Sequence, residues 1–298
     1  MFDGILIIDK PEGITSHDVV ARVRRILKMK RIGHTGTLDP FATGVMVIIV
    51  GKATRLAQFL DKDAKEYEAV VQFGFETDTG DLTGSRESRV ESRESVSVDE
   101  IERVLKDFRG EIEQTPPMYS AKKVDGKKLY ELARKGIEIE RKPVKVTIYK
   151  LEILNLKSET WNLKLRVVCS AGTYIRTLAQ DIGRKLGIGA HLGELRRTKA
   201  GKFDIEKAVT LEDLEKIVAA GKLGEILILM NEAVSHLPEI RLSAEEINRV
   251  KNGRTLKMES AEIADGNFCR MTDKDAQLIA VGFYDAAEKI VQPKLVLV

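Results

Sequence analysis

Asp39 is the side chain of this sequence best placed to do chemistry, because it lies in a polar, glycine-punctuated loop between a basic segment and an apolar one. Residues 33–44 read Gly-His-Thr-Gly-Thr-Leu-Asp-Pro-Phe-Ala-Thr-Gly. Glycines permit positive φ and a close approach of a ligand, and the proline holds Asp39 in extended geometry. We expect Asp39 to be a reacting carboxylate; the alternative is an ordinary turn residue before proline.

The segments on either side of this loop are expected to hold it in place. Residues 5–8 predict a buried strand, and Thr15 or Ser16 can cap the helix that follows. The apolar face of that helix carries Val19, Val20, Val23, Ile26 and Leu27. Residues 45–50 form a β-branched and apolar run, which is typical of a central strand, and residues 54–60 predict a short helix.

Period-two patterns predict two further strands that carry polar side chains. Residues 66–73 alternate between polar and apolar types, which places Tyr67 on the apolar side. Residues 161–169 alternate in the same way and lead to Gly172 and to a helix start at residues 174–176. Strands thus interleave irregularly with helices, which indicates an α/β or α+β enzyme with a mixed or antiparallel sheet.

The middle and the end of the chain have a different character. Residues 99–108 and 127–134 predict helices, closed by Gly110 and Gly136. Residues 85–97, with repeated Ser, Arg and Glu, predict a mobile surface insertion without chemistry. Near Pro238 the pattern changes again: a capping box at residues 243–246 opens a short helix, and the remainder predicts strands and turns.

Length and composition describe a globular protein rather than a membrane protein. The 298 residues exceed the usual size of one domain, so we expect two. No apolar run approaches the roughly 20 residues that cross a bilayer, and the start lacks an export signal, so the cytoplasm is the expected location. Cys169 and Cys269 form no CxxC pair, so we expect two buried thiols and no metal site. Gly51-Lys52 lacks the remaining residues of a phosphate-binding loop.

Positive charge is clustered although the net charge is only +3. Residues 22–31 carry six basic residues and no acid, and residues 122–150 carry ten basic residues against four acids. Clusters of one sign are what contact with phosphates needs. The alternative for each cluster is a solvated helix face. Two clusters that flank one candidate active site favour RNA as the partner.

Five segments of the chain, taken together, resemble the motifs of one enzyme family. The Asp39 loop is similar to the catalytic loop of the TruB-type tRNA pseudouridine synthases, which convert uridine 55 in the T arm of tRNA to pseudouridine. Residues 5–13 resemble the family's lysine–proline motif, and residues 65–69 its tyrosine strand. Residues 170–178 match its arginine motif, and residues 193–198 its leucine segment. Each match alone is weak, but five in the right order cover nearly the whole chain.

The resemblance implies an α+β fold in two domains. Residues 1–236 would form a pseudouridine synthase catalytic domain, with a largely antiparallel central sheet flanked by helices and with residues 85–97 as a flexible insertion. Residues 237–298 resemble a PUA domain, a small β-rich RNA-binding module, although the motifs of this match are looser.

The resemblance also implies roles for site residues. Asp39 would be catalytic, Arg176 would pair with it, and Tyr67 would stack on the displaced uracil while its hydroxyl helps to remove the C5 proton. Tyr174 and Leu195 would line the uracil pocket. Judged alone, Tyr67 and Leu195 are also consistent with core packing, and Arg176 with an ordinary ion pair.

Three further residues complete this implied set. His34 would occupy space near the nucleotides that are flipped out of the RNA; on sequence alone it could equally be a loop histidine bonded to backbone. Lys10 and Pro11 would support the active-site loop without reacting.

The implied reaction breaks the bond from ribose C1′ to uracil N1, turns the base and joins C5 to C1′. It needs no redox change, metal or phosphate donor, so no cofactor is expected. Asp39 could attack C1′, attack C6 of the base, or stabilise and deprotonate intermediates. The sequence does not choose among these routes.

The resemblance predicts tRNA as the partner, with its T arm in the catalytic cleft and its acceptor region on the C-terminal domain. We expect a monomer without an obligatory protein partner and without membrane contact. One alternative is a guide-RNA-dependent synthase of the same superfamily; the first motif begins within a few residues of Met1, without the extension those relatives carry. A second alternative is a non-catalytic protein that binds or folds tRNA.

Overall fold

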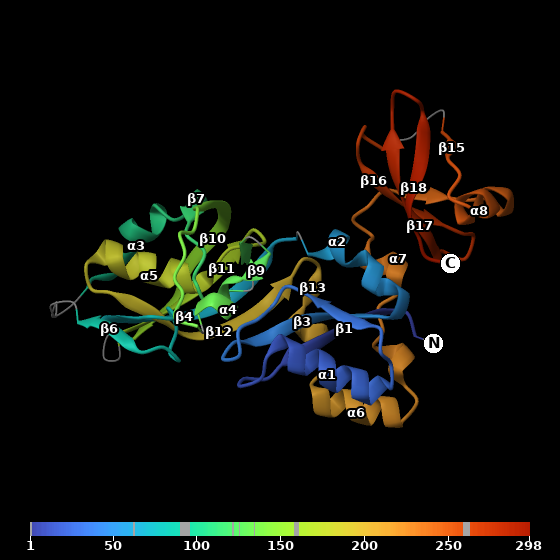
Figure 1. The fold of residues 1–298 in the computed structure, drawn as a ribbon. Coiled ribbons are helices and arrows are strands. Elements are labelled where there is room, and N and C mark those ends of the chain that lie inside the picture. Colours follow the sequence, from blue (N-terminus) through green and yellow to red (C-terminus); the bar gives the residue numbers. More distant parts are fainter. Residues whose placement is uncertain are drawn as a thin grey trace.

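The computed structural model describes residues 2–61, 63–89, 96–120, 122–124, 126–133, 135–157, 161–258 and 263–298 (Figure 1). These residues form a nine-stranded sheet, a five-stranded sheet and two two-stranded ribbons. Figure 1 shows the five-stranded sheet standing apart from the large one, beside α2 and α7. The predicted α+β class with a β-rich C-terminal part is confirmed.

The large sheet is almost entirely antiparallel. Its strands run in the spatial order β1-β3-β12-β4-β11-β10-β7, with β2 paired to β3 and β13 to β12. Within the described residues, β3 and β12 are the one parallel pair of this sheet. The strand bounds are β1 Gly4–Lys10, β2 Ile32–Thr35, β3 Thr43–Val50, β4 Lys65–Phe73, β7 Gly110–Gln114, β10 Val144–Lys157, β11 Asn162–Cys169, β12 Ala190–Ala200 and β13 Phe203–Asp204.

One half of this sheet is built around β1 and β3. Both strands are apolar and buried along nearly their whole length, as a strand covered on both faces must be. Helix α1 (Ser16–Leu27) starts at an N-cap, Thr15, in a capping box with Asp18. Its valines pack with α6 (Leu211–Ala219) against the two strands. The predicted capped helix and its apolar face are confirmed.

The other half of the sheet carries the second core. The alternating residues of β4 and β11 face α3 (Val98–Lys106) and α5 (Ile175–Leu186), which cover this face of the sheet in Figure 1. Tyr67, Ala69, Val71 and Phe73 all lie in this core, and Tyr67 is 9% exposed. The predicted placement of Tyr67 on the apolar side is confirmed.

The two halves meet at a short parallel contact that involves the end of the Asp39 loop. Arg196 pairs with Thr43 and Arg197 with Gly44, where β12 passes β3.

The other described helices before residue 237 are η1 Gly51–Leu56, α2 Ala57–Leu60, α4 Leu129–Ala133, η3 Ile205–Lys207, η4 Leu223–Glu225 and α7 Met230–Ala233. The predicted helix over 54–60 is thus a 3-10 turn followed by one α-helical turn.

The C-terminal part is a sheet with its own core. It contains β14 (Glu239–Arg241), β15 (Leu256–Lys257), β16 (Phe268–Thr272), β17 (Leu278–Asp285), β18 (Ile290–Val296) and helix α8 (Ala244–Lys251), whose capping box at Ser243 was predicted. Leu278, Val281 and Leu295 also join a cluster with Leu56 and Leu60 of the larger part. The two parts therefore share buried apolar surface, and the division at residue 237 stays a prediction.

Two predictions about the middle of the chain need correction. Residues 85–97 were predicted to be a mobile insertion, but Arg86–Arg89 forms strand β6, which pairs with β5 (Phe75–Thr77). The pairing satisfies the backbone hydrogen-bonding groups of both segments. Residues 90–95 of the predicted insertion lie outside the described residues. The helix predicted from residue 127 begins at Leu129, since Lys127–Lys128 (β9) pairs with Lys123–Val124 (β8). Arg134, its predicted end, also lies outside the described residues.

Candidate active site

The Asp39 loop is held on both sides by hydrogen bonds from distant segments. The Ser16 hydroxyl donates to the Leu38 carbonyl (3.0 Å) and accepts from the Leu38 amide (2.9 Å). The Gly13 amide donates to the Pro40 carbonyl (2.8 Å). These bonds fix the backbone immediately before and after Asp39, so the carboxylate is held on an ordered loop.

Lys10 provides the third support of this loop. Its ammonium is inaccessible to solvent and donates to the carbonyls of Pro11 (2.9 Å), Pro40 (3.0 Å) and Ala42 (2.6 Å). Burial lowers the pKa of Lys10 from 10.5 to about 8, with Asp39 acting in the opposite direction. Pro11 itself is exposed and contributes its carbonyl. The geometry suits the support role expected for these two residues.

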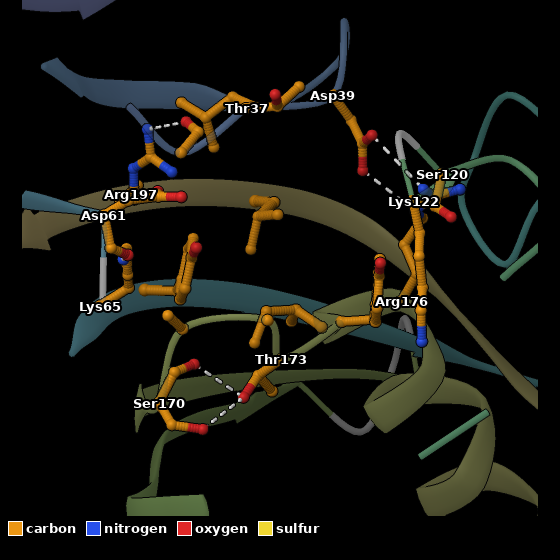
Figure 2. Close-up of a pocket in the computed structure, with 18 residues that line it drawn as sticks. Thr37, Asp39, Asp61, Lys65, Ser120, Lys122, Ser170, Thr173, Arg176 and Arg197 are labelled. Carbon is orange, nitrogen blue, oxygen red and sulfur yellow. Dashed lines mark hydrogen bonds and ion pairs between the residues drawn. The ribbon is translucent and has the colours of Figure 1, made fainter. Parts of the chain in front are cut away.

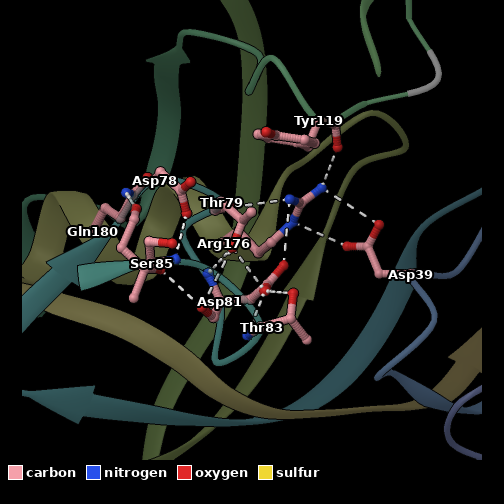
Figure 3. Close-up of polar contacts among 10 residues, drawn as sticks. Asp39, Asp78, Thr79, Asp81, Thr83, Ser85, Tyr119, Arg176 and Gln180 are labelled. Atoms are coloured by element: carbon pink, nitrogen blue, oxygen red, sulfur yellow. Dashed lines mark hydrogen bonds and ion pairs between the residues drawn. The ribbon is translucent and has the colours of Figure 1, made fainter. Parts of the chain in front are cut away.

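Asp39 and Arg176 form an ion pair. The Arg176 Nε lies 3.0 Å from Asp39 Oδ2, and its Nη2 donates to Oδ1 at 3.4 Å, which makes the pair two-pronged (Figure 3). The Arg176 side chain is 6% exposed, whereas that of Asp39 is 33% exposed. The arginine is therefore the buried anchor and the carboxylate is the group that a ligand can reach.

Arg176 also contacts three residues that were not predicted as site residues, namely Thr79, Asp81 and Tyr119. Its Nη1 donates to the Thr79 carbonyl (2.9 Å) and lies 3.4 Å from Asp81 Oδ2, while Nη2 donates to the Tyr119 carbonyl (2.6 Å). Asp81 is in turn held by the hydroxyl and amide of Thr83. Figure 3 shows Asp39 and Asp81 on different sides of the guanidinium. One cation thus serves two carboxylates.

The electrostatics of Asp39 follow from this arrangement. Desolvation raises the pKa of the Asp39 carboxyl, and the charge of Asp81 raises it further. Arg176 and Lys10 oppose the increase. A partly desolvated carboxylate beside an arginine is well suited to act as a nucleophile or a proton acceptor.

Asp39, Tyr67, Tyr174, Arg176 and Leu195 all line one cavity of about 250 Å³. Figure 2 shows Asp39, Lys122 and Arg176 at one end of it and Asp61, Lys65 and Arg197 at the other. A cavity of this size is below that of drug-sized ligands and suits one nucleobase. The structure therefore brings five of the predicted site residues together; their chemical roles stay predictions.

Two aromatic residues of the cavity are fixed by their strands and helices. Tyr174 is the N-cap residue of α5, and the Gln114 side chain both donates to its carbonyl (3.2 Å) and accepts from its amide (3.0 Å). Tyr67 lies opposite Arg197 in the β4–β12 ladder. Burial raises the pKa of the Tyr67 phenol, and Arg197 opposes that increase by its charge and a hydrogen bond.

His34, predicted to contact the substrate, does not line this cavity, and neither do the two support residues Lys10 and Pro11. It lies on β2, opposite Ile48 of β3, and its buried Nδ1 has no hydrogen-bond partner. Desolvation lowers the pKa of His34, and the charge of Arg197 acts in the same direction. His34 is therefore a neutral, half-buried ring beside the loop.

Sequence reasoning missed Asp81, Lys65, Lys122 and Arg197. Asp81 follows Asp78-Thr79-Gly80, a polar turn between two strands, and this turn was the available signal. Lys65 and Arg197 adjoin the matched tyrosine and leucine segments. Their burial, 7% and 1% exposed, could not be read from their residue types.

The two basic clusters differ in the structure. Lys122 of the second cluster lines the cavity. In the first cluster, Arg22 lies 3.7 Å from Glu212 of α6, and Arg24 donates to the Ile32 carbonyl at 2.7 Å. Part of the first cluster is thus satisfied within the protein, as the solvated-face alternative allows.

In the described ranges, no group of three or more His, Cys, Asp or Glu side chains is arranged to hold a metal ion. None of the helices in that part of the chain combines the length and apolar character needed to cross a membrane. Cys169 and Cys269 are free and buried, as predicted.

Comparison with known proteins defines the class. The model for the N-terminal domain of the TruB family pseudouridylate synthases matches residues 24–175, and the tRNA pseudouridylate synthase B C-terminal domain matches residues 176–235. A third model, the C-terminal domain of pseudouridine synthase II TruB, matches residues 238–297. The three matches together make the chain a pseudouridylate synthase, an enzyme of the isomerase class.

Whole-chain similarities specify the family. The chain is 48% identical to the tRNA pseudouridine synthase B of Geobacillus thermodenitrificans over 86% of both chains. It is 42% identical to the protein of that name from Solibacter usitatus, over 94% of this chain and 95% of the relative. This chain belongs to the TruB family of pseudouridylate synthases.

Solved structures share the whole fold at lower identity. One chain in a Cbf5-Nop10-Gar1 complex is 30% identical, with a TM-score of 0.77 over 99% of this chain and 85% of that chain. A chain in an H/ACA RNP bound to a substrate RNA containing 2′-deoxyuridine gives 29% identity and a TM-score of 0.76 over the same shares.

Proposed function

We propose that this protein converts uridine 55 in the T loop of tRNA to pseudouridine, without a cofactor and without a guide RNA. The observation that carries the proposal is the Asp39–Arg176 pair, which presents a carboxylate to a base-sized cavity lined by Tyr67, Tyr174 and Leu195. The names of the relatives with 42–48% identity support tRNA as the substrate.

The substrate base must leave its stack to reach this carboxylate. Asp39 lines the wall of a cavity that has room for about one base, so a uridine within a folded T loop must be flipped out to reach it, at a cost of about a few kcal/mol. Tyr67 and Tyr174 offer aromatic surface that replaces the lost stacking, and Leu195 packs on the ring. Lys122, at the same end as Arg176, is placed to meet a backbone phosphate.

The chemical step uses the groups already described. The C1′–N1 bond breaks while Asp39 bonds to C1′ or to C6 of the base, or stabilises the separated fragments; these routes stay open. Arg176 holds the carboxylate ionised and oriented. After the base turns and C5 joins C1′, the C5 proton is removed with the help of Tyr67.

Guide independence is supported by the ranking of similarities. The relatives with 42–48% identity carry the tRNA synthase name, whereas the chains in the H/ACA and Cbf5 complexes reach 29–30%. We propose that the protein acts as a monomer, with residues 1–236 as the catalytic domain and residues 237–298 as a PUA-like domain that contacts the acceptor region of tRNA. Arg270, which donates to Asn231 (2.7 Å), helps to fix that domain.

One experiment tests the function directly. Purified protein alone is incubated with unmodified tRNA whose uridines carry tritium at C5; tritium release and mapped pseudouridine at position 55 are expected. Asp39→Asn should give neither, while Asp63→Asn, outside the cavity, should behave as wild type. Activity that appears only after a guide RNA or partner proteins are added would establish the guide-dependent alternative. Normal binding without turnover would establish the non-catalytic one.

A further inference from the structure

Arg197 is among the largest side chains in the protein that are almost completely buried, at 1% exposed. It lies on β12 between the two halves of the large sheet. Its backbone pairs with Gly44 of β3 on one side and with Tyr67 of β4 on the other. Because opposite residues in a ladder point to the same face, its guanidinium and the Tyr67 ring share the cavity face of the sheet.

The guanidinium connects the loop of Asp39 to the sheet below it. Its Nε donates to the Val45 carbonyl (2.7 Å), and its Nη2 donates to the Gly36 carbonyl (2.8 Å; Figure 2). Gly36 has φ 65°, and a side chain there would begin 3.1 Å from Arg197 Nη1. Gly44 has φ 100°, and a Cβ atom there would lie 2.2 Å from the Arg197 carbonyl oxygen. Gly44 is therefore needed for the close approach of the β12 backbone, and Gly36 leaves room for the guanidinium.

The charge of Arg197 has no counterion within the described residues: no carboxylate among them forms an ion pair with it. A second buried cation, Lys65, lines the same end of the cavity and donates to the Asp63 carbonyl at 2.7 Å. The Asp61 side chain lines this end of the cavity too. Desolvation lowers the pKa of Lys65, and the charges of Asp61 and Asp63 oppose that change. Arg197 is thus the cation that lacks an ion-paired carboxylate among the described residues, and such buried groups do not favour stability and cluster at functional sites. The arrangement leaves the Arg197 guanidinium able to stabilise negative charge.

We propose that Arg197 is the positioning residue of Tyr67: it holds the phenol and the Gly36–Thr37 turn in register and stabilises negative charge on the phenol oxygen. This inference rests on the proposed function. The phenolate oxygen takes the C5 proton, the C5–H electron pair restores the ring double bond, and Tyr67 becomes a neutral phenol. That proton passes to solvent before the next turnover. A cation beside the oxygen favours the phenolate form that this step requires.

Two substitutions separate the contributions of charge and geometry. Arg197→Met removes the charge, and Arg197→Lys keeps it while losing the planar fork that reaches two carbonyls. With T-arm RNA, we expect kcat to fall about 10²- to 10⁴-fold in Arg197→Met, the range for a lost proton transfer, with KM changed far less. The kcat of Arg197→Lys should lie between those of the wild type and Arg197→Met.

A double-mutant cycle tests whether Arg197 acts through Tyr67. If it does, adding Tyr67→Phe to an Arg197 variant should reduce kcat much less than it does in the wild type, because the two residues serve one step. Additive losses would overturn the proposal.

The isotope effect from deuterium at C5 of the target uridine gives a readout that a folding role would not move. It should increase in Arg197→Lys, as in Tyr67→Phe, because proton removal becomes slow. The matched control is Arg196→Met, the neighbouring arginine on the opposite face of β12, which pairs with Asp9 at 2.7 Å. Its isotope effect should stay at the wild-type value.

The outcomes distinguish this inference from the proposed function. If the wild-type protein makes no pseudouridine, the proposed function is refuted. If the wild type is active but the losses in the double-mutant cycle are additive, only the proposed role of Arg197 is refuted. The same holds if the isotope effect of Arg197→Lys equals that of the wild type. If Arg197→Met does not fold, as a thermal unfolding scan would show, Arg197→Lys carries both measurements.

Discussion

Replacing Lys10 by methionine removes one ammonium and keeps most of the side-chain volume. In the wild type that ammonium donates to three carbonyls, and those of Pro40 and Ala42 lie one and three residues after Asp39. The substitution therefore tests whether the loop geometry, and not the reacting groups alone, sets the rate.

The cost can be worked from the structure. Leaving a buried carbonyl without its donor costs about 2 kcal/mol. The bond to Ala42 is buried and those to Pro11 and Pro40 are partly buried, so the three losses together cost at most about 6 kcal/mol. Removing the buried ammonium offsets part of this cost, because its pKa falls from 10.5 to about 8, which corresponds to about 3 kcal/mol. We expect Lys10→Met to lower the free energy of unfolding by at most about 3 kcal/mol. A loop displaced by about 1 Å lowers kcat about 100-fold.

The lowered pKa also predicts a pH effect. Above about pH 8 the neutral amine of Lys10 has two donors for three carbonyls, so kcat/KM should fall on the alkaline side. The folded pKa lies below the unfolded one, so between pH 8 and 10.5 the unfolded chain binds more protons. Lys10 therefore adds stability as pH rises through this window. Activity should be lost while the protein stays folded.

The assay combines urea unfolding with the pH profile of tritium release. Exposed Lys52→Met is the matched control and should change neither measurement. The reasoning would be refuted by a Lys10→Met protein with wild-type stability and turnover. It would equally be refuted if that variant kept an alkaline loss of activity centred near pH 8.

Four further outcomes are expected. Asp39→Asn should lower kcat at least about 10⁴-fold while T-arm binding, measured by filter retention, persists. Tyr67→Phe should bind RNA normally and lower kcat about 10²- to 10⁴-fold in single-turnover assays; an unchanged rate would exclude its role in proton transfer. The acid limb of kcat/KM should lie above the ordinary aspartate pKa of about 3.9, because burial raises the pKa of Asp39 and activity is lost as pH falls through it. Asp81→Asn should shift that limb to lower pH, since the Asp81 charge raises the pKa of Asp39, and should lower kcat about 100-fold by loosening Arg176; an unmoved limb would contradict the shared-cation arrangement.

Local patterns were the reliable part of the sequence analysis. The helix cap at Thr15 or Ser16, the capping box at Ser243, the buried strand β3 and the alternation that places Tyr67 in the core were all predicted, because each depends on residues close together in the chain. Strand β6 was missed because its polar sequence pairs with β5 through backbone groups, which leave no hydrophobic pattern.

Partners distant in sequence were the part that required the structure. The resemblance suggested that Asp39 and Arg176 meet across 137 residues, but nothing in the sequence indicated that Asp81 shares the same guanidinium. His34, expected beside the flipped nucleotides, lies outside the residues that line the cavity. Hydrophobic periodicity reports which face of an element is buried and says nothing about which side chain of another element lies against that face.

The sequence by itself determined the local elements and the loop that presents Asp39, since these follow from propensity, capping and turn chemistry. The choice of α+β over α/β came from the family resemblance, because the pattern of elements alone allowed both. Only the tertiary structure decided that Arg197 is a buried cation beside Tyr67 and that Lys10 binds three loop carbonyls. The reason is physical: charged residue types are normally exposed, and the carbonyls that stabilise these two in the interior belong to strands and turns that become neighbours only when the sheet forms.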